Sequence, residues 1–147
     1  MKRLKYISRF SRDMTREEIS DMVARAAKKN STLGITGFLM SSGRVFYQVI
    51  EGPEGNIDDL FRQIVADDRH RDVLLLDEET GVSKRFFPDW SMKKFDLDDD
   101  SVSRLSAARE NLMMILEMRR EIDRLTLAME RTVLRELASG LSDGPGR

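Results

Sequence analysis

The 147-residue chain contains no cysteine and only one histidine, His70. Without a thiol it can form no disulfide, no thiolate nucleophile and no cysteine-ligated metal centre. A single histidine excludes a multi-histidine zinc site within one chain and disfavours a serine or cysteine hydrolase. These absences remove several of the commonest enzyme classes.

A large excess of one charge and a long hydrophobic run are also missing. Lysine and arginine total 25 against 26 acidic residues, so net charge favours neither nucleic acid nor an acidic membrane surface as a partner. No apolar run approaches the roughly 18 residues of a membrane span. The charged N-terminus is not followed by the apolar core of a signal peptide. We therefore expect a cytoplasmic protein with no nucleic-acid or membrane partner.

A polar residue, Gln48, interrupts an apolar run over residues 45–50. Strand residues alternate between two faces, and both faces of this run are apolar, so we expect the strand to be covered on both sides. A buried carboxamide has up to four hydrogen bonds to satisfy and costs about 1–3 kcal/mol if it is left without partners. The sequence therefore predicts either a structural network around Gln48 or a bound polar ligand.

Hydrophobic periodicity predicts a β-α-β-β-α-β order with an extra strand. The expected strands cover residues 2–8, 35–40, 45–51 and 73–76, and Trp90-Ser91-Met92 lies in a final strand. The first helix follows a capping box at Thr15 and ends near Lys29, and the second is capped by Asn56 and ends near Asp68.

This order indicates an α+β, ferredoxin-like fold, in which two helices cover one face of a sheet. We expect the first and third strands to lie side by side and parallel at the sheet centre. Tyr6 and Gln48 would then be neighbours if both face the helices, and the space above them would lie between the two helices.

The composition changes after Phe95, where an acidic stretch over residues 96–100 leads into a long helical pattern. Apolar residues recur there at spacings of three and four, which is typical of a coiled-coil-like seam. We expect a domain over 1–96, a helical extension over 97–138 and a disordered tail over 139–147. The helix either packs on the open face of its own sheet or pairs with a second copy, and we expect a homodimer. The seam residues are Leu112, Ile115, Met118, Ile122, Leu125, Met129, Val133 and Leu137.

Six short elements follow one another in a characteristic order within residues 1–96. Together they resemble the BLUF family of flavin-binding blue-light sensors, although each element alone is unspecific. The elements are Tyr6, Lys29-Asn30, Gly34 to Gly37, Phe46 to Gly52, Asp68-Arg69-His70 and Trp90-Ser91-Met92.

The resemblance implies that FAD, with FMN as a possible substitute, lies between the two helices. Tyr6 matches a tyrosine that gives an electron and a proton to the excited flavin. Gln48 matches a glutamine that then rearranges its hydrogen bonds to the ring. Trp90 and Met92 match a pair that carries the signal out of the pocket to the C-terminal helices, which dimerise or contact a downstream protein.

The remaining implied contacts concern how the flavin is held. Asn30 matches an asparagine that binds the carbonyl and N3 edge of the ring, and Met22 and Ile64 match apolar residues pressed against it. Two positions depart from the family: Gln63 replaces an arginine or histidine, and Lys29 replaces an asparagine or histidine. We expect Arg69 to contact the phosphates.

Considered without the resemblance, several of these residues have ordinary structural explanations. Asn30 is a common helix-terminating residue, Tyr6 is an ordinary strand aromatic, and Trp90 and Met92 fill cores. We expect His70 to cap or pack at the end of the second helix.

Our interpretation is a non-enzymatic blue-light photoreceptor. The alternatives are a ferredoxin-like flavin-dependent redox enzyme and a ligand-free dimerisation module. The N-terminal residues also look like BLUF domains fused to nucleotide cyclases, but we expect no cyclase activity because the sequence has no room for such a domain.

Overall fold

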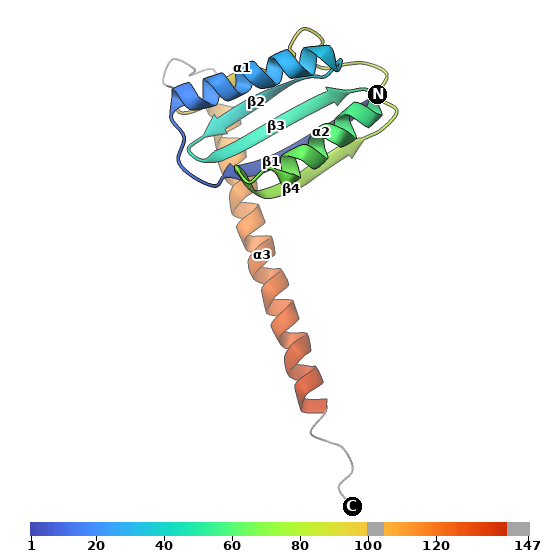
Figure 1. Cartoon of the computed structure of the whole chain (residues 1–147). Coiled ribbons are helices and arrows are strands. Elements are labelled where there is room, and N and C mark those ends of the chain that lie inside the picture. Colours follow the sequence, from blue (N-terminus) through green and yellow to red (C-terminus); the bar gives the residue numbers. More distant parts are fainter. Residues whose placement is uncertain (100–104, 141–147) are drawn as a thin grey trace, which may run out of the picture. The chain divides into compact units, whose positions relative to one another are not determined.

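The computed structural model describes residues 1–99 and 105–140, and it divides into two compact units, Met1–Ser106 and Ala107–Arg147. The first unit holds a five-stranded sheet and two helices (Figure 1). The second is the helix α3 (Ser106–Gly140). Apart from its first two residues, the predicted tail over 139–147 lies outside the described residues.

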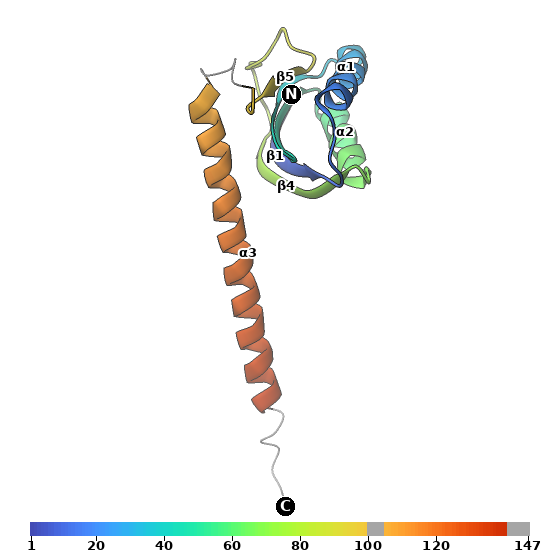
Figure 2. The same cartoon turned by 90° about the vertical axis from the view of Figure 1, so that its left-hand side faces the viewer.

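The sheet has the strand order β4-β1-β3-β2-β5, and α1 and α2 cover the same face of it (Figure 1, Figure 2). This arrangement confirms the predicted α+β, ferredoxin-like class. The elements of the first unit are β1 (Lys2–Phe10), α1 (Arg16–Thr32), β2 (Thr36–Ser42), β3 (Val45–Gly52), α2 (Glu54–Ala66), β4 (His70–Glu79) and β5 (Lys93–Asp96).

The prediction that the first and third strands are parallel is wrong, because β1 and β3 pair antiparallel. The crossover through α1 makes β1 and β2 run the same way, and the tight turn at Gly43-Arg44 reverses β3 between them. The predicted adjacency is nevertheless correct. Tyr6 stands opposite Gln48 in the register.

The helix ends show one correct cap and one wrong one. Thr15 and Glu18 form the predicted capping box on α1. The helix continues past Lys29 to Thr32, and Gly34, which has a left-handed backbone conformation, follows its end. Asn56 does not cap α2. That helix begins after Pro53, whose extended backbone sets the start three residues earlier. The Asn56 side chain instead donates to the Leu33 carbonyl.

The last two strands differ from expectation at their beginnings. β4 starts at His70, so His70 is a strand residue, and its backbone amide donates to the Asp67 carbonyl at the end of α2 at 3.0 Å. Trp90 and Met92 precede β5, because parallel pairing with β2 begins only at Lys93, opposite Phe38. They therefore lie in the connection that leads into the edge strand, before its regular pairing with β2 begins.

The main core of the first unit lies between the sheet and its two helices. It contains the buried residues Leu4, Tyr6, Phe10, Ile19, Val23, Ile35, Leu39, Phe46, Ile50, Ile57 and Met92.

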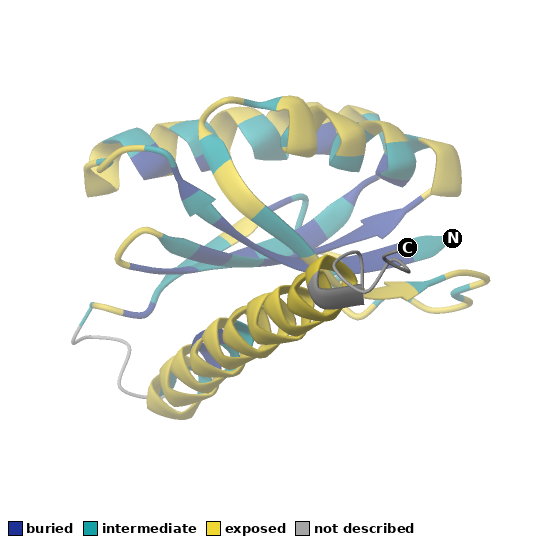
Figure 3. Cartoon of the chain, turned by 90° about the horizontal axis from the view of Figure 1, so that it is seen from below, coloured by how far each residue is buried: buried dark blue, intermediate teal, exposed yellow. Residues whose placement is uncertain are grey.

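The second unit is exposed along most of its length (Figure 3). Six of the eight seam residues are exposed large hydrophobics, from Met118 to Leu137. No helix within the described ranges is long and apolar enough to cross a bilayer.

Candidate functional site

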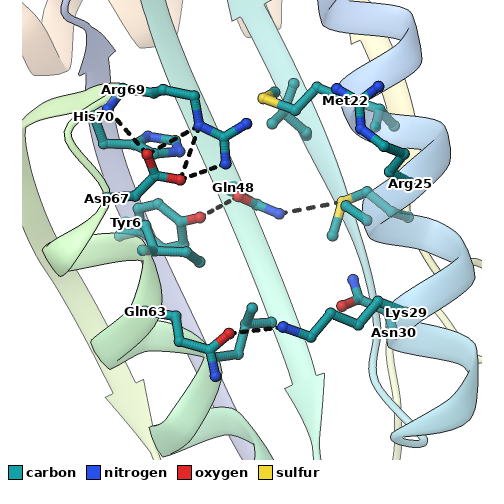
Figure 4. A pocket seen from close by; sticks show the side chains of 16 residues that line it. Tyr6, Met22, Arg25, Lys29, Asn30, Gln48, Gln63, Asp67, Arg69 and His70 are labelled. Atoms are coloured by element: carbon teal, nitrogen blue, oxygen red, sulfur yellow. Dashed lines mark hydrogen bonds and ion pairs between the residues drawn. The ribbon is translucent and has the colours of Figure 1, made fainter.

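A cavity of about 260 Å³ opens between α1 and α2 on the helix-covered face of the sheet (Figure 4). All of the predicted site residues line it except Trp90. They are Tyr6, Met22, Lys29, Asn30, Gln48, Gln63, Ile64, Arg69 and Met92.

At the floor of the cavity, Tyr6 and Gln48 form a buried hydrogen-bonded pair. The Tyr6 hydroxyl donates to Gln48 Oε1, and Gln48 Nε2 lies 3.2 Å from Met92 Sδ (Figure 4). Tyr6 is completely buried and Gln48 is 8% exposed. The carboxamide therefore has partners within the chain, on β1 and in the connection before β5.

The chemistry of these partners fixes the orientation of the amide. A thioether sulfur is only a weak acceptor, so it suits the NH₂ group of Gln48 and leaves the carbonyl for the tyrosine hydroxyl. Rotating the amide by half a turn would place the carbonyl oxygen against the sulfur, where no donor is present. Burial raises the pKa of Tyr6, which keeps its phenol protonated and available as the donor.

Asn30 joins the end of α1 to the segment before β5. Its side chain is buried, and Nδ2 donates to the Ser91 carbonyl at 3.0 Å. The backbone carbonyl of Asn30 accepts from the backbone amides of Leu33 and Ile35, just after the helix. Asn30 thus accepts the backbone bonds that close the last turn of α1, lines the cavity and holds Ser91, the residue next to Met92.

Lys29 and Gln63 connect the two helices across the cavity. Lys29 Nζ on α1 donates to Gln63 Oε1 on α2 at 2.7 Å (Figure 4). The family departures identified in the sequence therefore form one hydrogen bond with each other.

An ionic cluster after α2 completes the wall. Arg69 donates to both carboxylate oxygens of Asp67 at 2.5–3.0 Å, and this bonding lowers the pKa of Asp67 to about 2. His70 Nδ1 lies 3.1 Å from the Ser8 hydroxyl, and burial lowers the pKa of His70. Sequence reasoning did not select Asp67, His70 or Arg25 for this site, although the run Asp68-Arg69-His70 was noted.

Trp90 lies apart from the cavity lining. Its ring stacks on Phe87, with centroids 5.6 Å apart and an interplanar angle of 14°. Its carbonyl accepts from the Gly37 amide at 2.7 Å. Of the two residues predicted as a relay, Met92 is the one in contact with the glutamine.

The cavity lining suits a flat ring that has hydrogen-bonding groups on its edge. Three carboxamides, Asn30, Gln48 and Gln63, offer both donors and acceptors. Apolar side chains from both helices, including Met22 and Ile64, supply walls for the ring faces. Lys29, Arg25 and Arg69 place cationic groups in the same lining, which suits a ligand that carries phosphate.

Comparisons with known proteins agree on one family. The family model described as BLUF, sensors of blue light using FAD, matches residues 1–93. The beta subunit of photoactivated adenylate cyclase from Euglena longa is 34% identical over 100 residues, which cover 67% of this chain and 12% of that protein. The chain spans only 10–12% of the length of this relative and of the alpha subunit from Euglena gracilis.

Solved structures show the same relationship. A bacterial light-regulated adenylyl cyclase has a TM-score of 0.76 at 34% identity, covering 84% of this chain and 36% of that one. BlrB, a BLUF protein in its dark state, has a TM-score of 0.62 at 34% identity, covering 73% of this chain and 89% of that one.

Proposed function

The chain belongs to the BLUF family of blue-light sensors that use FAD, and from this we propose that Tyr6 and Gln48 carry its response to light. The observation that supports the assignment is the buried contact of the Tyr6 hydroxyl with the Gln48 amide, which also touches Met92. An oxidisable phenol, a reorientable carboxamide and a residue of the connection before β5 thus follow one another in direct contact.

A flavin, FAD or alternatively FMN, is the proposed ligand of the cavity, and when bound it supplies light absorption and an acceptor for an electron. The amides of Asn30, Gln48 and Gln63 would hold its ring edge. Met22 and Ile64 would flank its faces. Lys29 and Arg69 are the cations we assign to its more polar portion, and each would then exchange its present partner, Gln63 or Asp67, for the ligand.

The response we propose begins with transfer of an electron and the hydroxyl proton away from the Tyr6 phenol, and a bound flavin would accept both. Gln48 Oε1 is the group that faces this proton in the structure. Once the hydroxyl no longer donates, the present orientation of the Gln48 amide loses its main support, and the amide is free to exchange the ends that face Tyr6 and Met92.

The change would leave the site through the connection before β5. Met92 loses its contact with the Gln48 NH₂ group when the amide turns, and Trp90 lies two residues away along the chain. From there we propose transmission to α3, whose exposed seam pairs with a second copy of the chain or with a downstream protein. The homodimer is supported by the six exposed seam residues on α3.

Light sensing and not nucleotide cyclisation is the role we assign to this chain. The match to the adenylate cyclase relatives covers a small share of those proteins. It also overlaps the part that the BLUF model recognises in this chain.

The experiment that tests this function is an absorption spectrum of the purified protein in the dark and after blue light, with the bound chromophore identified by mass. We expect a flavin spectrum that shifts reversibly. Gln48→Leu should abolish the shift, because leucine fills similar space without hydrogen bonding. Gln63→Leu removes the same group from the opposite wall and should weaken flavin binding while keeping the shift.

Three results would contradict the proposal. A persistent light-induced shift in Gln48→Leu would remove the glutamine from the response. A flavin that is bleached by reductant or substrate turnover without any photocycle would favour a redox enzyme, and a folded protein that binds no flavin would favour a dimerisation module.

A further inference from the structure

On the sheet face opposite the cavity, Arg3 on β1 and Glu51 on β3 form a buried ion pair. Their side chains are 2% and 0% exposed, and Arg3 Nε lies 3.0 Å from Glu51 Oε2. Glu79 on β4 also binds Arg3, at 2.9 Å. The cost of removing two charges from water cancels most of their attraction, so such a pair adds little to the free energy of unfolding. Its main effect is to hold neighbouring groups in place.

This pair holds the segment 84–87, which leads towards Trp90. The two carboxylate oxygens of Glu51 accept from the backbone amides of Phe86 and Phe87, at 3.1 and 2.7 Å. Arg3 donates to the Lys84 carbonyl at 2.9 Å, and its guanidinium lies 3.5 Å from the centre of the Phe86 ring. Both charged groups therefore bind the segment directly.

Arg85 adds a second attachment from the segment back to the sheet. Its guanidinium donates to the Glu51 carbonyl at 3.0 Å, to Thr36 Oγ1 at 2.7 Å and to the Gly34 carbonyl at 2.6 Å. We refer to Arg3, Glu51 and Arg85 as the clamp. It fixes the segment by directional bonds, which an apolar pair of the same volume could not supply.

The clamp is connected to the photochemical site by a short series of contacts. Phe87 is bonded by its amide to Glu51, stacks on Trp90 and accepts the Trp90 amide at its carbonyl. The Trp90 carbonyl is held in turn by Gly37, where a Cβ would lie 2.0 Å from the Val49 carbonyl oxygen. Two residues after Trp90, Met92 touches Gln48.

We propose that the Arg3–Glu51 pair is a positioning device that sets where Trp90 and Met92 lie relative to Gln48, and thereby how fast the light-shifted state returns to the dark state. The first half of this statement depends only on the clamp geometry. The second half rests on the proposed photochemical function. A clamp that favours the present position of Met92 lowers the free energy of the dark arrangement, so loosening it slows the return.

The test compares Glu51→Gln with wild type and with the control Asp77→Asn, in the flavin-loaded full chain. The glutamine can accept from only one of the two backbone amides and no longer neutralises Arg3. Asp77→Asn removes an ion pair between β4 and Lys5 on β1, and none of the bonds that the structure describes for Asp77 reaches residues 84–87. Trp90 is the only tryptophan of the chain, so its fluorescence reports the segment without a label.

We expect acrylamide to quench Trp90 more strongly in Glu51→Gln than in wild type or the control. We also expect recovery after illumination to slow by about 2- to 30-fold, the range of coupling between linked sites. Arg85→Gln loosens the same segment, and because Arg85 bonds only neutral acceptors, the change leaves no buried charge without its partner. It should change both quantities in the same direction, and it carries the test if Glu51→Gln does not fold.

Quenching equal to wild type in both folded variants would overturn the proposal. Stronger quenching with an unchanged or faster recovery would overturn its second half. If quenching rises but no light-induced shift occurs even in wild type, the clamp geometry is supported and the proposed photochemical function fails. The two proposals are thereby separated by measurements on the same samples.

Discussion

The Tyr6–Gln48 pair makes a quantitative prediction about stability. Tyr6→Phe leaves the buried Gln48 carbonyl without its donor, and Gln48→Leu leaves the buried Tyr6 hydroxyl without its acceptor. Each single variant should lose about 1–3 kcal/mol of unfolding free energy, the cost of one buried polar group without a partner. The double variant removes both polar groups together, so it should lose about 1–3 kcal/mol less than the sum of the singles.

The measurement is equilibrium urea unfolding of the four proteins without added flavin, at one protein concentration, followed by Trp90 fluorescence. Comparable slopes against urea are required for the free energies to be compared. Tyr47→Phe, at the only other tyrosine, serves as the control, and its change should be about 0.5 kcal/mol or less because it lies outside the pair.

An additive cycle would refute the reasoning. If the double variant loses as much as the two singles together, the hydroxyl and the amide do not satisfy each other. The site would then need another explanation for its buried carboxamide.

Three further predictions concern other parts of the chain. Gly37→Ala should reduce the urea midpoint more than Gly43→Ala, because a Cβ at Gly37 meets the backbone of the neighbouring strand while one at Gly43 meets nothing within 4 Å. The pKa of His70 is lowered in the folded state, so the unfolded chain takes up the proton first as the pH falls. The free energy of unfolding should therefore fall as the pH drops below about 6.5. His70→Asn should lose this part of the pH dependence in urea titrations from pH 8 to 5. Leu125→Asp, on the seam of α3, should convert a dimer to a monomer in sedimentation experiments, whereas Leu127→Asp, on the other side of that helix, should not; equal behaviour of the two variants would count against the seam.

The sequence carried enough information for the fold class and for the central pair of the site. The order of the elements placed the strands of Tyr6 and Gln48 next to each other, and the structure shows that both side chains lie on the helix-covered face. The predicted direction of the strands was wrong. The crossover through α1 makes β1 and β2 run the same way, and the hairpin between β2 and β3 then makes β3 antiparallel to both.

Local signals failed where longer-range contacts decide. Asn56 has the composition of a helix cap, but Pro53 sets the start of α2 and the asparagine finds a tertiary partner in Leu33. His70 follows a helix in sequence, yet pairing with Phe10 draws it into β4. Neither partner is visible from the neighbouring residues.

The clamp shows what periodicity cannot reveal. Arg3 and Glu51 are charged residues within strands, where alternation alone predicts a solvent-exposed position. Their burial depends on a segment more than thirty residues away that folds over them. A charged residue on each of two neighbouring strands was the available signal, and only the register of β1 against β3 pairs them.

β5 has one more consequence. It is four residues long, has a single neighbour in the sheet and joins it at an edge. Such a strand can detach at low free-energy cost, and its amides should exchange with deuterium well before those of β1 and β3. This edge of the sheet can therefore open locally while the strands beneath the cavity remain paired.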